Sequence, residues 1–154
     1  MKQVFLICAH KDIGQLNALV EALCDPDFTV YVHLDRKSAL DPAALHPAAR
    51  LVAPRIDVRW GGFSQVQATL VSLRQILREQ PDFDKVVFLS AQDFPLLPNA
   101  LLKRELMRLQ DHELLETAPI RPGGWNVDFR YRFFYREGGG RLERLACAPV
   151  SYTH

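Results

Sequence analysis

Two aspartates follow apolar, β-prone runs, at positions where a carboxylate could bind a ligand. Asp35 follows FTVYVHL, and Asp93 follows KVVFLS inside the string LSAQDFPLL. A carboxylate fixed at the end of a strand can accept hydrogen bonds from a ribose hydroxyl or from the N–H of a base. Each aspartate could equally cap the turn that follows its strand, and position alone leaves both roles open.

A Trp-Gly-Gly step, from Trp60 to Gly62, stands in front of the helical pattern SQVQATLVSLRQILRE. Glycine tolerates backbone angles that other residues avoid, and it lets a ligand come close to the main chain. Two glycines in succession before a helix therefore predict a turn that is shaped for contact with a ligand.

The aspartates and histidines that could bind a metal ion stand at positions that do not favour a metal site. The Asp-x-Asp strings DPD, residues 25–27, and DFD, residues 82–84, both precede strands, so we interpret them as turns at the edge opposite the proposed ligand. His10 and His33 lie at strand ends but have no cysteine or histidine partner at metal-ligand spacing. We therefore expect no metal site.

Common phosphate-binding and nucleophile motifs are absent from the sequence. No Gly-x-Gly-x-x-Gly follows the first strand, and neither a Walker-type Gly-Lys-Ser/Thr nor a Gly-x-Ser-x-Gly elbow occurs anywhere. These absences disfavour a dinucleotide-dependent redox enzyme and an NTPase, and they leave a hydrolase of the elbow type without its nucleophile.

Alternating strand and helix patterns position these residues. Strands are predicted at residues 3–9, 28–34 and 85–90, with one short strand within 51–58 and a weaker one at 113–117. Helices are predicted after an Asp12 cap, at residues 42–45, from a Ser64 cap to residue 79, and from an Asn99 cap to about residue 109.

This alternation predicts an α/β fold with an open, mostly parallel sheet and helices on both faces. The carboxyl ends of parallel strands meet at one edge of the sheet, and ligands of such sheets bind there. His10, Asp35, Trp60 and Asp93 all follow predicted strands. We therefore expect a binding site at this edge.

The composition narrows the class of protein. The chain has 154 residues, 48% of them hydrophobic, which suffices for one core in a single domain or part of one. The net charge of +1 gives no general attraction to nucleic acid or to an anionic membrane. Three separated cysteines, Cys8, Cys24 and Cys147, indicate a reduced, cytoplasmic setting. The short apolar start predicts a first strand and not a signal peptide or membrane span.

Beyond residue 119 the chain becomes rich in aromatic residues and arginines. Aromatic faces between cations can stack against a sugar, and they would also fit a single-stranded nucleic acid. The balanced charge of the whole chain favours the sugar, so we predict a carbohydrate partner and no nucleic acid.

Several strings occur in an order that resembles a known family. AHK, VHLDRKS, WGG with SQVQATL, LSAQDFPL and LETAP resemble the core-2/I-branching β-1,6-N-acetylglucosaminyltransferases and the related peptide O-xylosyltransferases. The resemblance runs from about residue 4 to residue 135 and covers the first half of the family's catalytic domain. It implies a GT-A-type, Rossmann-like fold. It also implies inverting transfer of a sugar, N-acetylglucosamine or xylose first among the candidates, from a UDP donor without a metal ion or other cofactor.

The resemblance also assigns residues to the two substrates. Asp35 and Arg36 would contact the uridine, Asp93 would lie beside the donor sugar, and Trp125 could instead be a packed loop aromatic. The full donor-binding set is Ile7, Ala9, Asp35, Arg36, Trp60, Gly62 and Asp93, and the acceptor-binding set is Glu116, Trp125 and Arg130.

The family's catalytic base is a glutamate in the second half of its domain, and the basic residues that neutralise the UDP diphosphate follow later. Since this chain ends at SYTH before those positions, we expect a truncated glycosyltransferase domain that binds better than it catalyses. We expect it in a bacterial-type cytoplasm, at most peripheral to the inner membrane. A non-catalytic UDP-sugar or carbohydrate binding module stays open as an alternative, as does an unrelated α/β protein whose strand ends are ordinary turns.

Overall fold

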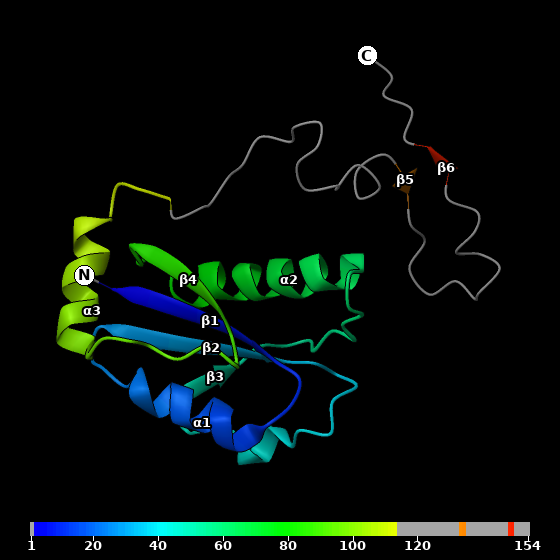
Figure 1. Cartoon of the computed structure of the whole chain (residues 1–154), viewed down its shortest axis with the longest axis horizontal. Coiled ribbons are helices and arrows are strands. Elements are labelled where there is room, and N and C mark those ends of the chain that lie inside the picture. Colours follow the sequence, from blue (N-terminus) through cyan, green and yellow to red (C-terminus); the bar gives the residue numbers. More distant parts are fainter. Residues whose placement is uncertain (1, 114–132, 135–147, 150–154) are drawn as a thin grey trace, which may run out of the picture. The chain divides into compact units, whose positions relative to one another are not determined.

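The structure, a computed structural model, describes residues 2–113, 133–134 and 148–149 (Figure 1). The chain divides into two units, Met1–Glu113 and Leu114–His154. In the second unit, strands β5 (Phe133–Phe134) and β6 (Ala148–Pro149) pair antiparallel. The first unit contains all of the predicted donor-binding residues.

The first unit is built on a four-stranded sheet in the order β3-β2-β1-β4, and every neighbouring pair is parallel. Its strands are β1 (Gln3–Ala9), β2 (Phe28–Leu34), β3 (Ala49–Leu51) and β4 (Lys85–Ser90). The chain winds outward from β1 to β3 and then crosses to β4 on the other side of β1. The strand order therefore reverses between β1 and β4, the point at which open α/β sheets bind ligands.

Helices cover both faces of this sheet, which confirms the predicted α/β fold (Figure 1). Helices α1 (Ile13–Ala22) and α3 (Asn99–Arg108) pack on one face, and α2 (Phe63–Glu79) packs on the other; η1 (Pro42–Ala44) is a single 3-10 turn. None of the helices in the described residues is long and apolar enough to cross a membrane.

Alternate residues of β1 divide the core into two clusters. Phe5 and Ile7 pack with Leu16, Leu19 and Leu106 on one face. Val4 and Leu6 pack with Tyr31 and Ile76 on the other face. Because each fully buried side chain of this size contributes about 1.5–3 kcal/mol, β1 is fixed from both sides and its carboxyl end is a rigid support.

The strands predicted at β1, β2 and β4 are confirmed with their bounds. The Asp12 cap of α1 is also confirmed, since its Oδ1 accepts the Gln15 N–H at 2.9 Å. The weaker strand predicted at residues 113–117 lies almost entirely outside the described residues.

Two predicted helix caps are wrong. Helix α2 begins at Phe63 with Gly62 as its cap, because the Ser64 hydroxyl accepts the Arg59 N–H at 2.8 Å across the preceding loop. Helix α3 has Pro98 as its cap, and Asn99 instead donates from Nδ2 to the Cys24 carbonyl at 3.1 Å. Both side chains bond to backbone outside their own helix instead of capping its end.

The strand predicted within residues 51–58 is also misplaced, because β3 ends at Leu51. The Gln75 side chain forms hydrogen bonds with the backbone at the end of β3. Its Oε1 accepts the Ala53 N–H at 2.9 Å, and its Nε2 donates to the Leu51 carbonyl at 3.2 Å. Pro54 offers no N–H for a ladder. Residues 52–58 therefore run as a loop toward the carboxyl edge of the sheet.

Candidate functional site

A cavity of about 440 Å³ opens at the carboxyl edge of the sheet. This volume lies within the range of small-molecule sites, about 300–1,000 Å³. The ends of β1, β2 and β4 and the loop before α2 line it: Cys8, Ala9, His10, His33, Asp35, Lys37, Val58, Trp60, Gln65, Phe88, Leu89 and Ser90. The cavity therefore lies at the predicted edge and at the point where the strand order reverses.

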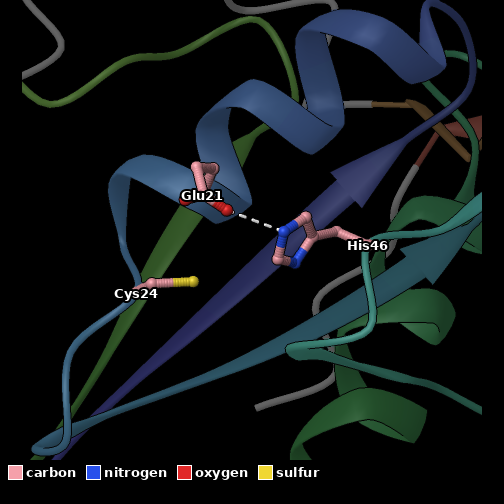
Figure 2. A group of neighbouring side chains, drawn as sticks. All are labelled: Glu21, Cys24 and His46. Carbon is pink, nitrogen blue, oxygen red and sulfur yellow. Dashed lines mark ion pairs between the residues drawn. The ribbon is translucent and has the colours of Figure 1, made fainter.

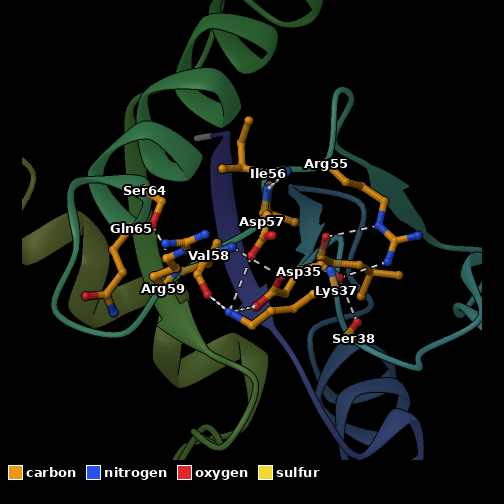
Figure 3. A network of polar contacts seen from close by, with 12 residues as sticks. Asp35, Lys37, Ser38, Arg55, Ile56, Asp57, Val58, Arg59, Ser64 and Gln65 are labelled. Carbon is orange, nitrogen blue, oxygen red and sulfur yellow. Dashed lines mark hydrogen bonds and ion pairs between the residues drawn. The ribbon is translucent and has the colours of Figure 1, made fainter. Parts of the chain in front are cut away.

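The carboxylate of Asp35 is buried beside this cavity, with 5% of the residue exposed. Its Oδ1 accepts the Lys37 N–H at 3.1 Å and the Val58 N–H at 3.2 Å (Figure 3). The first bond caps the turn after β2, and the second fixes the loop before α2 to the end of β2. Capping and a place at the cavity therefore coexist in one residue.

Lys37 brings a cation to the same place. Its Nζ lies 3.5 Å from Asp35 Oδ2 and 3.6 Å from Asp57 Oδ1, and it donates to the Val58 carbonyl (Figure 3). Of the lining residues, it is the one lysine or arginine. Its side chain is 52% exposed, so the ammonium can still reach a ligand anion.

The loop of residues 55–58 is held on the end of β2 by further bonds. Arg55 donates from Nε to the Leu34 carbonyl at 3.1 Å and from Nη2 to the Asp35 carbonyl at 2.8 Å. Ile56 donates its N–H to His33 Nε2 at 2.9 Å. Burial lowers the pKa of His33, and the nearby Asp35 charge opposes this in part. His33 is therefore a neutral acceptor that positions the loop.

The Trp-Gly-Gly step forms the mouth of the cavity. Gly61 has a φ of 72°, in the left-handed region that glycine favours, and its N–H donates to Gln65 Oε1 at 2.8 Å. Gly62 has an extended backbone that any residue could adopt. Trp60 lines the cavity with 94% of its surface exposed, so its ring is free to stack on a ligand.

Asp93 turns back toward its own strand. Its Oδ2 accepts the Ser90 N–H at 2.7 Å, and its N–H donates to the Ser90 carbonyl at 3.0 Å. The turn-capping interpretation is thus confirmed for this aspartate. Phe88, Leu89 and Ser90 border the cavity from β4 in its place.

Comparison with known sequences identifies the family. The profile described as "Branch: Core-2/I-Branching enzyme" matches residues 4–136. The chain belongs to the core-2/I-branching enzyme family. This match covers both the described cavity and most of the predicted acceptor region.

Curated relatives are glycosyltransferases by name. A xylosyltransferase of Ciona intestinalis is 27% identical over 120 residues, 73% of this chain and 14% of that protein. Beta-1,3-galactosyl-O-glycosyl-glycoprotein beta-1,6-N-acetylglucosaminyltransferase 4 of Danio rerio is 26% identical over 136 residues, 83% of this chain and 32% of that protein. N-acetyllactosaminide beta-1,6-N-acetylglucosaminyl-transferase of Homo sapiens is 31% identical over 102 residues, 62% of this chain and 25% of that protein. The match thus spans at most 32% of the length of these relatives.

The structure of this branching-enzyme chain brings only some of the predicted donor residues together. Ala9, Asp35 and Trp60 line the cavity. Ile7 is fully buried in the core, and the exposed Arg36 is tied by its N–H to the Ile56 carbonyl at 3.0 Å. Neither these two nor Gly62 and Asp93 are among the lining residues, and Glu116, Trp125 and Arg130 lie outside the described residues.

Nine of the twelve lining residues were not proposed as donor contacts from the sequence: Cys8, His10, His33, Lys37, Val58, Gln65, Phe88, Leu89 and Ser90. Lys37 stands in the family string VHLDRKS, two positions after Asp35, so the motif contained the signal but did not say which cation faces the cavity. Phe88 is 56% exposed although it sits inside an apolar strand, a property that no sequence pattern reveals.

The Asp-x-Asp string at residues 25–27 lies at the opposite, amino edge of the sheet. Asp25 Oδ1 accepts the Asp27 N–H at 2.9 Å, which closes the turn. Lys103 of α3 places Nζ 3.0 Å from Asp25 Oδ1 and 2.9 Å from Asp27 Oδ2. The backbone bond from Asp27, aided by Lys103, lowers the pKa of Asp25 although desolvation opposes it. The interpretation as turn chemistry is confirmed here.

Proposed function

We propose that this chain is the donor-binding part of an inverting, metal-independent glycosyltransferase. That glycosyltransferase takes N-acetylglucosamine or xylose from a UDP-sugar and transfers the sugar to a carbohydrate acceptor. The observation that carries the proposal is the buried Asp35 carboxylate beside a cavity whose mouth is formed by the exposed Trp60 ring. A planar base with N–H donors suits such a site.

Recognition of the uridine uses Asp35 Oδ2, which lies 3.5 Å from Lys37 Nζ. Oδ1 already accepts two backbone N–H bonds, so Oδ2 is the oxygen that takes a donor from the base or ribose. Trp60 supplies a face on which the base stacks, and base stacking on an aromatic ring contributes about 1–3 kcal/mol.

The donor set at the cavity supports metal independence. Divalent metals that hold diphosphates are bound by one or two carboxylates together with the phosphates. Asp35 is the one carboxylate among the lining residues, and both of its oxygens already have partners: Oδ1 accepts two backbone N–H bonds, and Oδ2 lies 3.5 Å from Lys37 Nζ. Lys37, at the same wall, offers a positive charge to the diphosphate in place of the metal.

Inverting transfer forms a bond from an acceptor oxygen to the anomeric carbon of the sugar as the bond to UDP breaks. The acceptor proton goes to a carboxylate base, and the electron pair of the broken bond leaves on UDP. No residue of the described cavity is assigned as this base, because Asp35 is held for the nucleotide. We propose that donor binding is the activity of this chain and that transfer needs the base found elsewhere in the family's domain.

Calorimetric titration with UDP, UDP-N-acetylglucosamine and UDP-xylose tests the proposal, each with magnesium and with a chelator. Cytidine diphosphate is the matched control, because it carries the same phosphates on a different base. We expect UDP to bind with or without chelator and cytidine diphosphate to bind more weakly. Binding that requires magnesium would contradict metal independence. If UDP fails to bind both this chain and a longer one, the donor-site assignment is wrong.

A non-catalytic UDP-sugar or carbohydrate binding module is the second candidate. It is favoured by the same commitment of Asp35, which leaves the described cavity without a free carboxylate base. A transfer assay with radiolabelled UDP-sugar separates the two candidates when this chain and a longer chain are compared. Donor binding without transfer in both would favour the module.

A further inference from the structure

Three possible metal ligands gather at the amino edge of the sheet, away from the cavity (Figure 2). Glu21 lies in the last turn of α1, Cys24 lies in the turn that follows, and His46 lies in the loop between η1 and β3. Their ligand atoms all lie within 4.8 Å of one another. His46 Nε2 is 2.7 Å from Glu21 Oε2. None of the three lines the donor cavity.

The loop that carries His46 is already fastened to α1. Asn17 donates from Nδ2 to the Ala44 carbonyl at 2.9 Å, and its Oδ1 accepts the His46 N–H at 2.9 Å. These two bonds fix the backbone of His46 over the end of the helix. The imidazole therefore meets Glu21 from a prepared position, and less conformational entropy is lost when a ligand joins them.

A thiolate, an imidazole and a carboxylate form a ligand set that suits Zn²⁺. Donor atoms around a tetrahedral zinc lie roughly 3.3–3.7 Å apart, given bond lengths of about 2.0–2.3 Å. The Glu21 side chain is 71% exposed and Cys24 is exposed, so both can rotate the last ångström or so. A water molecule would complete the tetrahedral set as the fourth ligand.

We propose that Glu21, Cys24 and His46 bind a zinc ion that joins the loop before β3 to the end of α1. The ion would bridge two elements that flank β2, at the edge of the sheet opposite the donor cavity. It is thus a stabilising site, separate from sugar transfer, and it is compatible with a donor site that needs no metal.

Binding requires definite proton movements. The Cys24 thiol donates to the Val20 carbonyl at 3.4 Å, and this S–H bond breaks as the zinc–sulfur bond forms. His46 Nδ1 accepts the Ala48 N–H at 3.2 Å, so the imidazole proton sits on Nε2. Ligation through Nε2 moves that proton to Nδ1 and breaks the long bond from Ala48. One proton, from the thiol, is released per zinc bound to the neutral imidazole.

A nucleophilic role for Cys24 fits the group less well. Burial, with a smaller effect from the Glu21 charge, raises the pKa of the Cys24 thiol above its ordinary value. A reactive cysteine needs the opposite shift, and the imidazole next to it faces Glu21. A metal ion supplies the positive charge that would stabilise the thiolate.

Cobalt titration of the full chain, prepared without a histidine tag, tests the site. We expect a thiolate-to-cobalt charge-transfer band that zinc displaces, and a higher melting temperature in the presence of zinc. Cys24→Ser should abolish the band and lower zinc affinity well over ten-fold, because even loss of a partner outside the coordination shell costs roughly 10- to 100-fold. Glu21→Gln should weaken binding while leaving the band.

The matched controls are Cys8→Ser and Cys147→Ser, which should keep both the band and the zinc affinity of the wild-type chain. Cys8 borders the donor cavity, and its thiol pKa is raised to about 11 by burial. Absence of a thiolate band in the wild-type chain would overturn the proposal. So would zinc affinity that is unchanged by Cys24→Ser, or a band that is lost with Cys147→Ser instead.

Discussion

The two edges of the sheet both carry aspartates, but they use them differently. At the amino edge, the carboxylates of Asp25 and Asp27 are paired with Lys103 at 3.0 and 2.9 Å. At the carboxyl edge, Asp35 accepts two backbone N–H bonds through a single oxygen and lies beside a cavity. The first arrangement joins two elements through charge, and the second fixes a carboxylate through Oδ1 while its Oδ2 lies 3.5 Å from Lys37, another lining residue of the cavity.

This difference shows why residue type alone cannot separate structural acids from binding acids. The amino edge holds two Asp-x-Asp strings, the pattern expected of a metal-dependent donor site, and in the first of them both aspartates are paired with a lysine. In the second string, Asp84 accepts the Lys2 N–H at 2.6 Å. The position of an aspartate before or after a parallel strand separates structural acids from binding acids better than residue type does, because the cavity lies at the carboxyl ends of the strands.

Substitution of Asp35 should have the largest effect, because it acts on both folding and binding. Asp35→Ala leaves the part-buried N–H groups of Lys37 and Val58 without their acceptor, and because water can reach them the loss in unfolding free energy should be below the roughly 1–3 kcal/mol that a fully buried group costs. UDP affinity should fall roughly ten-fold or more, since a hydrogen bond to a charged group contributes about 1.5–3 kcal/mol. Urea unfolding and calorimetry measure the two effects.

Asp35→Asn separates these effects, because the amide keeps an acceptor for the two N–H groups but loses the charge. We expect near wild-type stability and weak UDP binding. Asp41→Ala is the control: Asp41 also caps a turn, by accepting the Ala43 N–H at 2.9 Å, but it does not line the cavity. If all three variants bind UDP equally well, Asp35 is only a turn cap and the contrast between the edges fails.

Trp60→Ala should affect binding alone. The ring is 94% exposed, so the unfolding free energy should change by less than about 0.5 kcal/mol. Loss of base stacking should weaken UDP binding by about 1–3 kcal/mol, which is roughly 5- to 150-fold. Phe63→Ala is the matched control, because Phe63 is 65% exposed nearby and does not line the cavity. Equal UDP affinity of the two variants would remove Trp60 from the site.

The architecture could be predicted from the sequence because it depends on strong local patterns. The apolar runs of β1, β2 and β4 have the composition of strands buried on both faces, and all three have the predicted bounds. The edge of the sheet that holds the cavity followed from the order of elements. Asp35 could be placed at that edge because it directly follows β2, whereas Trp60 reaches the same edge through the loop after β3 and not through the strand predicted within residues 51–58.

The errors in the helix caps and in the third strand involve side-chain contacts with residues outside the element concerned. Ser64 and Asn99 have the types that cap helices, but their side chains bond Arg59 and Cys24 across loops. In place of the strand predicted within residues 51–58, the backbone after Leu51 bonds to the side chain of Gln75, which comes from α2. The approach of His46 to Glu21 was equally hidden, since it depends on how the loop after η1 folds back on α1. Local propensity contains none of these partners.

Lys103→Met tests the amino edge and should have a smaller effect. It leaves Asp25 and Asp27 without their shared cation, so the melting temperature should fall while UDP affinity stays unchanged. The loss should shrink at high salt, because screening weakens exposed ion pairs. Arg104→Met is the control, since Arg104 only approaches Glu105 at 4.0 Å. A fall in UDP affinity for Lys103→Met alone would show that the two edges are coupled.

The pH dependence that arises from His33 should be the smallest effect, and it belongs to the carboxyl edge. Burial lowers the pKa of His33 in the folded chain below its ordinary value of about 6.5. Below that pH the unfolded chain binds the proton more readily than the folded chain does. The free energy of unfolding therefore decreases as the pH is lowered, until His33 is also protonated in the folded chain. Above about pH 6.5 the stabilising contribution of the neutral His33 is fully present. The slope for one proton is at most about 1.4 kcal/mol per pH unit.

His33→Gln isolates this contribution, because the amide oxygen can accept the Ile56 N–H without titrating. Urea unfolding on either side of pH 6.5 or so should show a flatter pH dependence for this variant than for the wild-type chain. His112→Gln, whose side chain is exposed, should keep the wild-type slope. Parallel curves for His33→Gln and the wild-type chain would mean that His33 has the same pKa in the folded and unfolded states. In that case the bond from Ile56 to Nε2 would contribute nothing to the stability of the fold, and the loop at the cavity would be held by its other bonds, including those of Asp35 and Arg55.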